Sequence, residues 1–183
     1  MAKFVPITVR LKSGEELVIR EAAPEDAAAL LDFVDQVSRE SDYLTFGPGE
    51  FGITLEREQE FLETVRHKPN AIFLIGLLGH EVVASLSFAG GGRPRIAHVG
   101  EFGMSVRKAY WEMGIGTAML KAFLDWARQT GVIRKVNLRV RVDNPRAIAL
   151  YEKCGFRVEG RISREMQVNG KFYDTLLMGK AID

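Results

Sequence analysis

Two glycines that stand two positions apart, Gly114 and Gly116, have the clearest chemical meaning in this chain. They lie in residues 106–119, VRKAYWEMGIGTAM, where an apolar run ends and a helical pattern begins at once. Glycine has no Cβ, so a turn built on it adopts unusual dihedral angles and lets N–H groups approach a ligand. The first N–H groups of a helix are unpaired and lie at the positive end of its dipole. We therefore expect a phosphate site on the backbone amides that include Met113, Gly114, Gly116 and Thr117.

The glycine spacing excludes two familiar phosphate motifs. A dinucleotide-binding fold needs a third Gly or Ala three residues after the second glycine, where this chain has Met119. A P-loop needs Gly-Lys-Ser/Thr, whereas Gly116 is followed by Thr117 and Ala118. The predicted anion site therefore belongs to another class.

The residues around this turn extend the pattern. Residues 101–106 read Glu-Phe-Gly-Met-Ser-Val, Tyr110-Trp111 follow, and residues 144–156 read Asn-Pro-Arg-Ala-Ile-Ala-Leu-Tyr-Glu-Lys-Cys-Gly-Phe. Together they resemble the GNAT superfamily of acetyl-CoA-dependent N-acetyltransferases, with its Q/R-x-x-G-x-G/A loop and N-x-x-A-x-x-L-Y-E-K-x-G-F helix. The motifs are most similar to the branch of ribosomal-protein N-terminal alanine acetyltransferases and spermidine acetyltransferase. The resemblance covers residues 98–178 closely.

The loop departs from the family pattern at two places. Trp111 stands where Gln or Arg is usual, and Glu112-Met113 replaces the common Gly-Lys. A carboxylate beside a diphosphate is unfavourable, so we expect Glu112 to point to solvent, with Arg107 or Lys108 offsetting its charge.

The resemblance implies a mixed α/β fold, with a central, mostly antiparallel splayed sheet and helices on both faces. It also implies transfer of an acetyl group from acetyl-CoA to a primary amine, directly and in a ternary complex. The acceptor is then a small-molecule amine or a peptide N-terminus. A catalytically silent acyl-CoA-binding regulator on the same fold is the rival function, which the cofactor loop alone does not exclude.

The resemblance assigns Glu101 as general base and Tyr151 as the acid that protonates the departing thiolate. Glu101 precedes Gly114 by thirteen residues on the strand that enters the loop, and Tyr151 follows Asn144 by seven, on the same side of a helix. The structural alternatives are a solvated or paired strand glutamate and a half-buried core tyrosine.

Backbone groups complete the expected cofactor site. The N–H groups near Met104 to Val106, at the splayed strand end, are suited to bind the thioester oxygen and the pantetheine amides. Asn144 is expected to cap a helix first and to contact the cofactor second.

Covalent and metal chemistry are less favoured. Cys154 would serve a ping-pong route if it were acylated, but no His or Asp lies near it in sequence. His98 falls on the opposite strand face from Glu101, and three scattered histidines with one cysteine make no metal-ligand spacing. We expect no metal.

Hydrophobic periodicity predicts the elements that position these residues. A hairpin, a helix from Pro24, an aromatic loop over 41–53 and a helix capped by Thr54 precede two central strands. That loop holds Tyr43, Phe46 and Phe51, which either pack beneath it or wall the substrate site. The expected strands are residues 7–11, 16–20, 71–78, 81–88, 97–106, 135–142, 156–167 and 172–180, and the later helices are 116–129 and one from Asn144 to Gly155.

The whole chain of 183 residues suits a single domain, residues 1–183, with a sizeable core. Its 25 basic and 24 acidic side chains give no general argument for nucleic acid or a membrane surface. One cysteine, no signal-peptide pattern and no apolar run near the roughly 18 residues of a membrane span favour a cytoplasmic enzyme. The sequence leaves open whether it is a monomer or a homodimer.

The charges are nevertheless segregated along the chain. Residues 21–63 hold twelve acidic and two basic side chains, whereas residues 128–171 hold eleven basic and four acidic ones. In the resembling family the first two helices and their loop wall the acceptor side. The acids of that wall either are simply solvated or favour a cationic acceptor; they are Asp32, Asp35, Glu40, Asp42 and Glu50.

Overall fold

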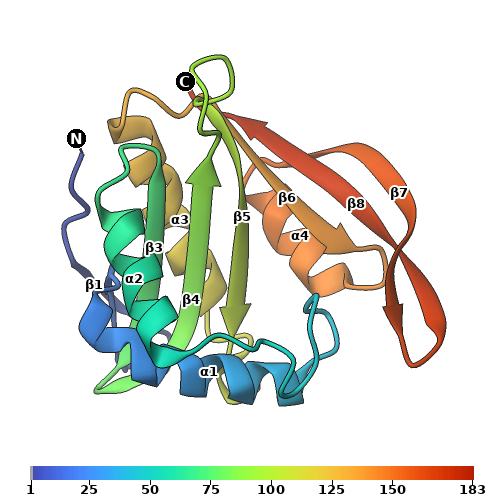
Figure 1. Ribbon diagram of the computed structural model, residues 1–183, viewed down its shortest axis with the longest axis horizontal. Helices are drawn as coiled ribbons and strands as arrows, with labels where there is room; N and C mark the ends of the chain where they lie inside the picture. The colour runs from blue at the N-terminus through green and yellow to red at the C-terminus, as the bar shows by residue number, and fades with distance from the viewer. Residues whose placement is uncertain (1) are drawn as a thin grey trace.

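The structure, a computed structural model, describes residues 2–183 (Figure 1). Its eight strands form one sheet in the order β1-β2-β3-β4-β5-β6-β8-β7. The strands are β1 (Ile7–Arg10), β2 (Glu16–Glu21), β3 (Ala71–Leu78), β4 (Glu81–Gly90), β5 (Val99–Val106), β6 (Lys135–Arg141), β7 (Arg157–Val168) and β8 (Lys171–Ala181). The helices are α1 (Ala27–Glu40), α2 (Leu55–Arg66), α3 (Ile115–Gln129) and α4 (Pro145–Lys153), with 3-10 turns at Pro24–Asp26 and Lys108–Tyr110.

The sheet splits between β5 and β6. These two strands are parallel, whereas every other neighbouring pair is antiparallel. Their pairing ends at Glu101 and Asn137, beyond which β5 stays with β4 and β6 stays with β8. Figure 1 shows β5 and β6 starting side by side and then diverging. The predicted mixed α/β fold with a splayed, mostly antiparallel sheet is confirmed.

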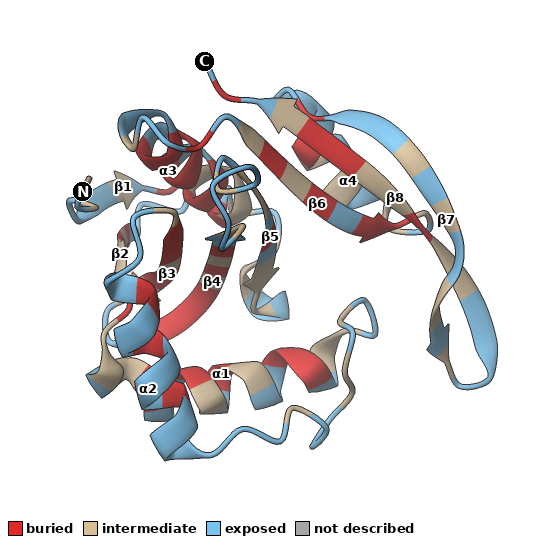
Figure 2. Cartoon of the chain, turned by 45° about the horizontal axis from the view of Figure 1, so that its top comes forward, coloured by how far each residue is buried: buried red, intermediate tan, exposed pale blue. Residues whose placement is uncertain are grey.

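Helices cover both faces of this sheet. On one face, α1 and α2 pack on β3 through buried side chains such as Phe33, Leu62 and Ile75. On the other face, α3 and α4 bury a larger aromatic core, in which the Phe102 ring lies 5.5 Å from Phe123 and 5.8 Å from Tyr151. Figure 2 shows β3 and β4 largely buried and β7 largely exposed. Phe102, Met104 and Val106 of β5 face the α3 and α4 core, whereas the alternate residues Glu101 and Gly103 lie on the opposite face and are exposed.

Local sequence signals fix most element ends. The Thr54 hydroxyl accepts the Arg57 N–H at 3.3 Å, and the Asn144 side chain accepts the Ala147 N–H at 3.3 Å, so both predicted helix caps are confirmed. Positive φ values of 48° and 77° at Asn169 and Gly170 make the predicted hairpin turn between β7 and β8.

The predicted strand 97–106 begins two residues late, at Val99. The Asn70 side-chain amide donates to the carbonyl oxygens of Gly91 and Ala97, at 3.1 and 3.0 Å. These bonds hold residues 91–97 in a loop. The contact joins positions far apart in sequence, which is why local pattern misplaced this boundary.

Candidate active site

A cleft of about 510 Å³ opens where β5 and β6 diverge. Its walls are the end of α1 with the loop after it, the last residues of β5, the turn into α3, and α4. Seven predicted site residues line it: Met104, Val106, Gly114, Gly116, Thr117, Asn144 and Tyr151. Met113 packs against the core and Glu101 lies beyond the lining.

The edge of β5 presents backbone groups to this cleft. The Arg107 N–H donates to the Val83 carbonyl of β4 at 2.9 Å, so alternate residues of β5, including Ser105, direct their N–H groups to β4. Met104 and Val106 then direct theirs the other way. Within residues 2–183 no strand lies beside that edge after Glu101, so these amides are available to a ligand.

The N-terminus of α3 forms the floor of the predicted anion site. Gly114 caps the helix with φ of 86°, a left-handed conformation that side chains other than glycine adopt only with strain. The first helical bond here runs from the Ala118 N–H to the Gly114 carbonyl at 3.0 Å. The N–H groups of residues 115–117 therefore have no partner in the helix.

Gly116 is required for space instead of conformation. A Cβ built at this position would lie 3.2 Å from Leu150 of α4 and 3.5 Å from the Met104 side chain. Both neighbours line the cleft. A larger residue would therefore fill the cleft from its α3 side.

Tyr151 lies in the α4 wall with only 8% of its surface exposed. Burial raises the pKa of its phenol to about 12, so the hydroxyl keeps its proton at neutral pH. Among side-chain atoms of residues 2–183, only Asn137 Oδ1 is both fully buried and without a hydrogen-bond partner. The Tyr151 hydroxyl also has no hydrogen-bond partner within those residues, so its oxygen is not fully buried. Because Tyr151 lines the cleft, this oxygen is in contact with the cleft.

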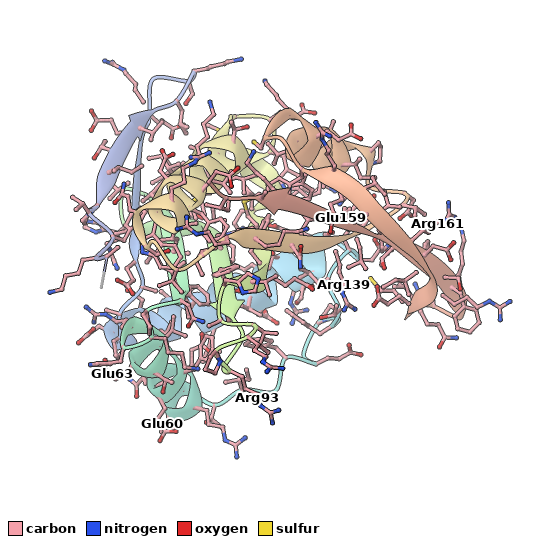
Figure 3. The ribbon with its side chains drawn as sticks, turned by 90° about the horizontal axis from the view of Figure 1, so that it is seen from above. Glu60, Glu63, Arg93, Arg139, Glu159 and Arg161 are labelled. Atoms are coloured by element: carbon pink, nitrogen blue, oxygen red, sulfur yellow. The ribbon has the colours of Figure 1, made fainter. Side chains whose placement is uncertain are left out.

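Glu101 lies at the apex of the split, on the other face of the sheet from Tyr151. It occupies the last pairing position between β5 and β6, beside Asn137. Its carboxylate is half-exposed and lies 3.4 Å from the guanidinium of Arg139 on β6, which is labelled in Figure 3. Arg139 also pairs with Glu165 of β7. The structure brings Glu101 to the apex but holds it in an ion pair.

The expectation about the charge of Glu112 needs a correction. Its side chain is 78% exposed, as expected, but its ionic partner is Arg146 of α4 at 3.7 Å. Arg107 is already held by Glu40 at 2.9 Å and Glu81 at 3.2 Å. Sequence proximity favoured Arg107 because α4 lies more than thirty residues away along the chain.

The loop over residues 41–53 is fastened to β6 by Arg141. The Arg141 side chain is 3% exposed. Its guanidinium lies 3.6 Å from the Tyr173 ring centre and 4.8 Å from the Tyr43 ring centre, and donates to the Asp42 carbonyl at 2.9 Å. Asp143 accepts two further bonds from it. Tyr43 lines the cleft, in the position that the predicted wall requires, whereas the rings of Phe46 and Phe51 pack against each other in a tilted arrangement with centres 5.0 Å apart.

Other lining residues were not predicted from the sequence. Ala147 and Leu150 follow Asn144 at the three-residue helical spacing that places side chains on one face, which is a usable signal. Arg146 carried no such signal, because its neighbour Trp111 lies on another element. Cys154 lies outside the lining.

A family model described as "Acetyltransferase (GNAT) family" matches residues 37–156. The chain belongs to the GNAT acetyltransferase family. It is thus an acetyl-CoA-dependent acyltransferase, and the site fits this cofactor through the free α3 amides, the open β5 edge and the close approach that Gly116 permits.

Curated relatives of this GNAT chain are N-acetyltransferases. The Escherichia coli L-amino acid N-acetyltransferase AaaT is 28% identical over 64% of the chain and 73% of the relative. Spermidine N(1)-acetyltransferase of Vibrio cholerae is 32% identical over 43% of the chain and 45% of the relative.

Solved acetyltransferase structures share this fold. A GNAT acetyltransferase from Streptococcus pneumoniae superposes with a TM-score of 0.88 at 34% identity, covering 91% of the chain and 99% of the neighbour. The Salmonella typhimurium protein yncA, solved with its cofactor acetyl-CoA, gives 0.79 at 19% identity over 91% of the chain and 94% of the neighbour. The second likeness supports the fold alone.

No three His, Cys, Asp or Glu side chains come together as metal ligands within residues 2–183. In the same range, no helix combines the length and apolarity needed to cross a membrane.

Proposed function

We propose that this protein acetylates a primary amine by direct transfer from acetyl-CoA, with both substrates bound at once. One observation carries the proposal: a protonated, buried phenol at Tyr151 faces the same cleft as the open β5 edge and the N-terminal end of α3. The cofactor, when bound, supplies the activated acetyl thioester. We treat residues 1–183 as one catalytic domain.

Tyr151 is proposed to give its proton to the departing sulfur. A phenol with a pKa of about 12 remains a donor throughout the neutral range. Met104 and Val106 are proposed to direct their backbone N–H groups at the thioester oxygen, where charge develops. The amides of residues 113–117 are proposed to hold the diphosphate, with Asn144 as a further contact.

Glu101 is proposed to take the proton of the acceptor ammonium, directly or through water. Its position at the apex supports this role, because the acceptor must meet the thioester where β5 and β6 part. Arg139, 3.4 Å from this carboxylate, holds it at the apex until the acceptor arrives. Cys154 has no part in this scheme, since it does not line the cleft.

The names of the relatives support an amine acceptor but differ on its kind. One acts on L-amino acids and another on spermidine. We propose a small cationic amine or a peptide N-terminus, on the strength of the acidic α1 wall and its loop. We also propose a cytoplasmic location, since the single cysteine suits a reducing compartment.

A screen of amines tests the proposal against a silent acyl-CoA-binding regulator. Purified protein is mixed with acetyl-CoA and each amine, and release of the CoA thiol is followed. We expect amine-dependent release that Glu101→Gln lowers on the order of 10²-fold, as is typical for loss of a general base. The matched control is Glu165→Gln, which also removes a carboxylate from Arg139 but lies on β7; it should stay near wild type. Binding of acetyl-CoA without release for any amine would establish the regulator instead.

A further inference from the structure

The cleft has one basic side chain. Among the residues that line it within the described range 2–183, Arg146 alone is a lysine or arginine. It occupies the second position of α4, directly after the Asn144 cap and Pro145. Its side chain is 53% exposed, so it is free to reorient without unpacking the core.

Trp111 explains why this arginine is needed. It stands at the loop position where the family pattern has Gln or Arg, and its indole N–H already donates to the Val106 carbonyl at 2.8 Å. Trp111 therefore has no donor left for a phosphate. Its ring instead supports the Arg146 guanidinium, which lies 4.4 Å from the ring centre.

Glu112 adds a second reason. Its backbone φ of 66° places a carboxylate in the turn just before the anion-binding amides. Arg146 lies 3.7 Å from that carboxylate, a loose contact between two exposed groups. A diphosphate with more negative charge competes well for the same guanidinium.

We propose that Arg146, held on the face of Trp111, binds the diphosphate of acetyl-CoA and replaces the missing side-chain donor of the loop. The donor is thus supplied from α4, across the cleft, instead of from the turn before α3. This inference rests on the acetyl-CoA cofactor and on no particular acceptor, so its failure would leave amine acetylation untouched.

The test is the affinity for CoA measured by calorimetry with no amine present. Arg146→Met keeps the length and apolar packing of the side chain but removes its charge. We expect it to weaken CoA binding roughly 10- to 100-fold, the usual value of a charge-assisted hydrogen-bonded contact. The matched control is Lys108→Met, because Lys108 also lies over the Trp111 ring, at 5.8 Å, but outside the cleft lining. It should leave the affinity unchanged.

Two ligand variants locate the phosphate. Arg146→Met should weaken the binding of 3′-dephospho-CoA by the same factor as the binding of CoA. It should not weaken the binding of pantetheine, which has no phosphate. An equal loss with pantetheine would mean that Arg146 acts only through packing. If Arg146→Met did not weaken the binding of 3′-dephospho-CoA, Arg146 would contact the 3′-phosphate of CoA instead of the diphosphate, and the proposal would be wrong.

A second substitution tests whether Arg146 replaces the missing side-chain donor of the loop. In the Arg146→Met background, Trp111→Arg returns a donor to the loop position and should recover most of the lost CoA affinity. A folded double variant, as judged by circular dichroism, that binds CoA no better than Arg146→Met would contradict a replacement of one donor by the other. The Arg146→Met and Lys108→Met comparison stands even if that double variant does not fold.

Discussion

Tyr151 illustrates how one side chain acquires its chemistry from its surroundings. The phenol is 8% exposed between Phe102 and Phe156, and this burial raises its pKa. Tyr151→Phe keeps the ring contacts and removes only the hydroxyl. We expect turnover to fall on the order of 10²-fold with CoA affinity nearly intact, since the proton transfer occurs only during reaction. Steady-state kinetics with calorimetry checks this, and parental turnover across the pH range would remove Tyr151 from the mechanism.

The same pKa predicts a stability effect at alkaline pH. The phenol ionises near pH 10 in the unfolded chain and at about 12 in the native protein. Below pH 10 both states keep the proton, so no effect appears there. As pH rises from about 10 towards 12 the unfolded chain loses its proton first, and native stability falls by on the order of 2 to 3 kcal/mol.

Urea unfolding of the wild type and Tyr151→Phe measures this effect. The wild type should lose stability relative to the variant only above about pH 10, because the variant has no phenol at this position. An unfolding free-energy difference that stays constant through that range would show that the phenol is not shielded as the structure has it.

At the scale of residues, the sequence predicted the parts of the site that local rules dictate. Gly114 and the Asn144 cap follow from backbone requirements at a helix start, whereas Gly116, which is needed for space, was found from the spacing of the two glycines. Arg141 and Arg146 escaped prediction because their roles come from aromatic rings on other elements, namely Tyr43, Tyr173 and Trp111. Contacts of this kind have no signature within a short stretch of sequence.

The turn into α3 gives a prediction at the scale of elements. In Gly116→Val, the new side chain meets Leu150 and Met104 and intrudes on the cleft. We expect markedly weaker CoA binding with little loss of stability, because the position has an ordinary φ. Gly114→Ala is the contrasting variant, since a Cβ there meets nothing but its φ of 86° is strained. Calorimetry measures CoA binding and thermal unfolding measures stability for both variants, which separates the steric effect at Gly116 from the backbone strain at Gly114. If Gly116→Val bound CoA as tightly as the parent, the diphosphate would lie elsewhere.

The Arg141 contact gives another prediction about elements, the anchoring of residues 41–53. Arg141→Met removes the guanidinium, and with it the contacts to two aromatic rings and three hydrogen bonds. The Arg141 side chain is only 3% exposed. We expect a loss of about 2 to 4 kcal/mol in the free energy of unfolding. The control Arg161→Met breaks the exposed pair with Asp174 and should cost much less. Equal losses in urea unfolding would contradict a special role for Arg141.

Element types and their order were predictable because hydrophobic periodicity and caps are local. The split between β5 and β6 was expected only from the resemblance, since strand pairing joins residues such as Glu101 and Asn137 that lie 36 positions apart. The start of β5 shifted for the same reason, through the distant Asn70 side chain.

At the scale of the whole molecule, charge segregation predicts which amines the protein prefers as acceptors. Three acids of the wall are paired in the structure, Asp35 with Arg39, Glu40 with Arg107 and Asp42 with Arg141. The pairing weakens the field of the wall without reversing it. We expect kcat/KM to be highest for cationic amines and to fall with added salt, because screening acts over about 8 Å at physiological ionic strength. Preference for acidic amines, or no salt response, would contradict a cationic acceptor.

The most direct test of direct acetyl transfer is a single turnover with isotopically labelled acetyl-CoA, with and without an active amine, followed by mass spectrometry of both the protein and the small molecules. We expect the label to appear on the nitrogen of the acceptor, with one CoA thiol released per acetyl group and no labelled protein at any time. Label that remains on CoA with every amine tested, or that first appears on the protein at Cys154, would contradict direct transfer to an amine in this cleft.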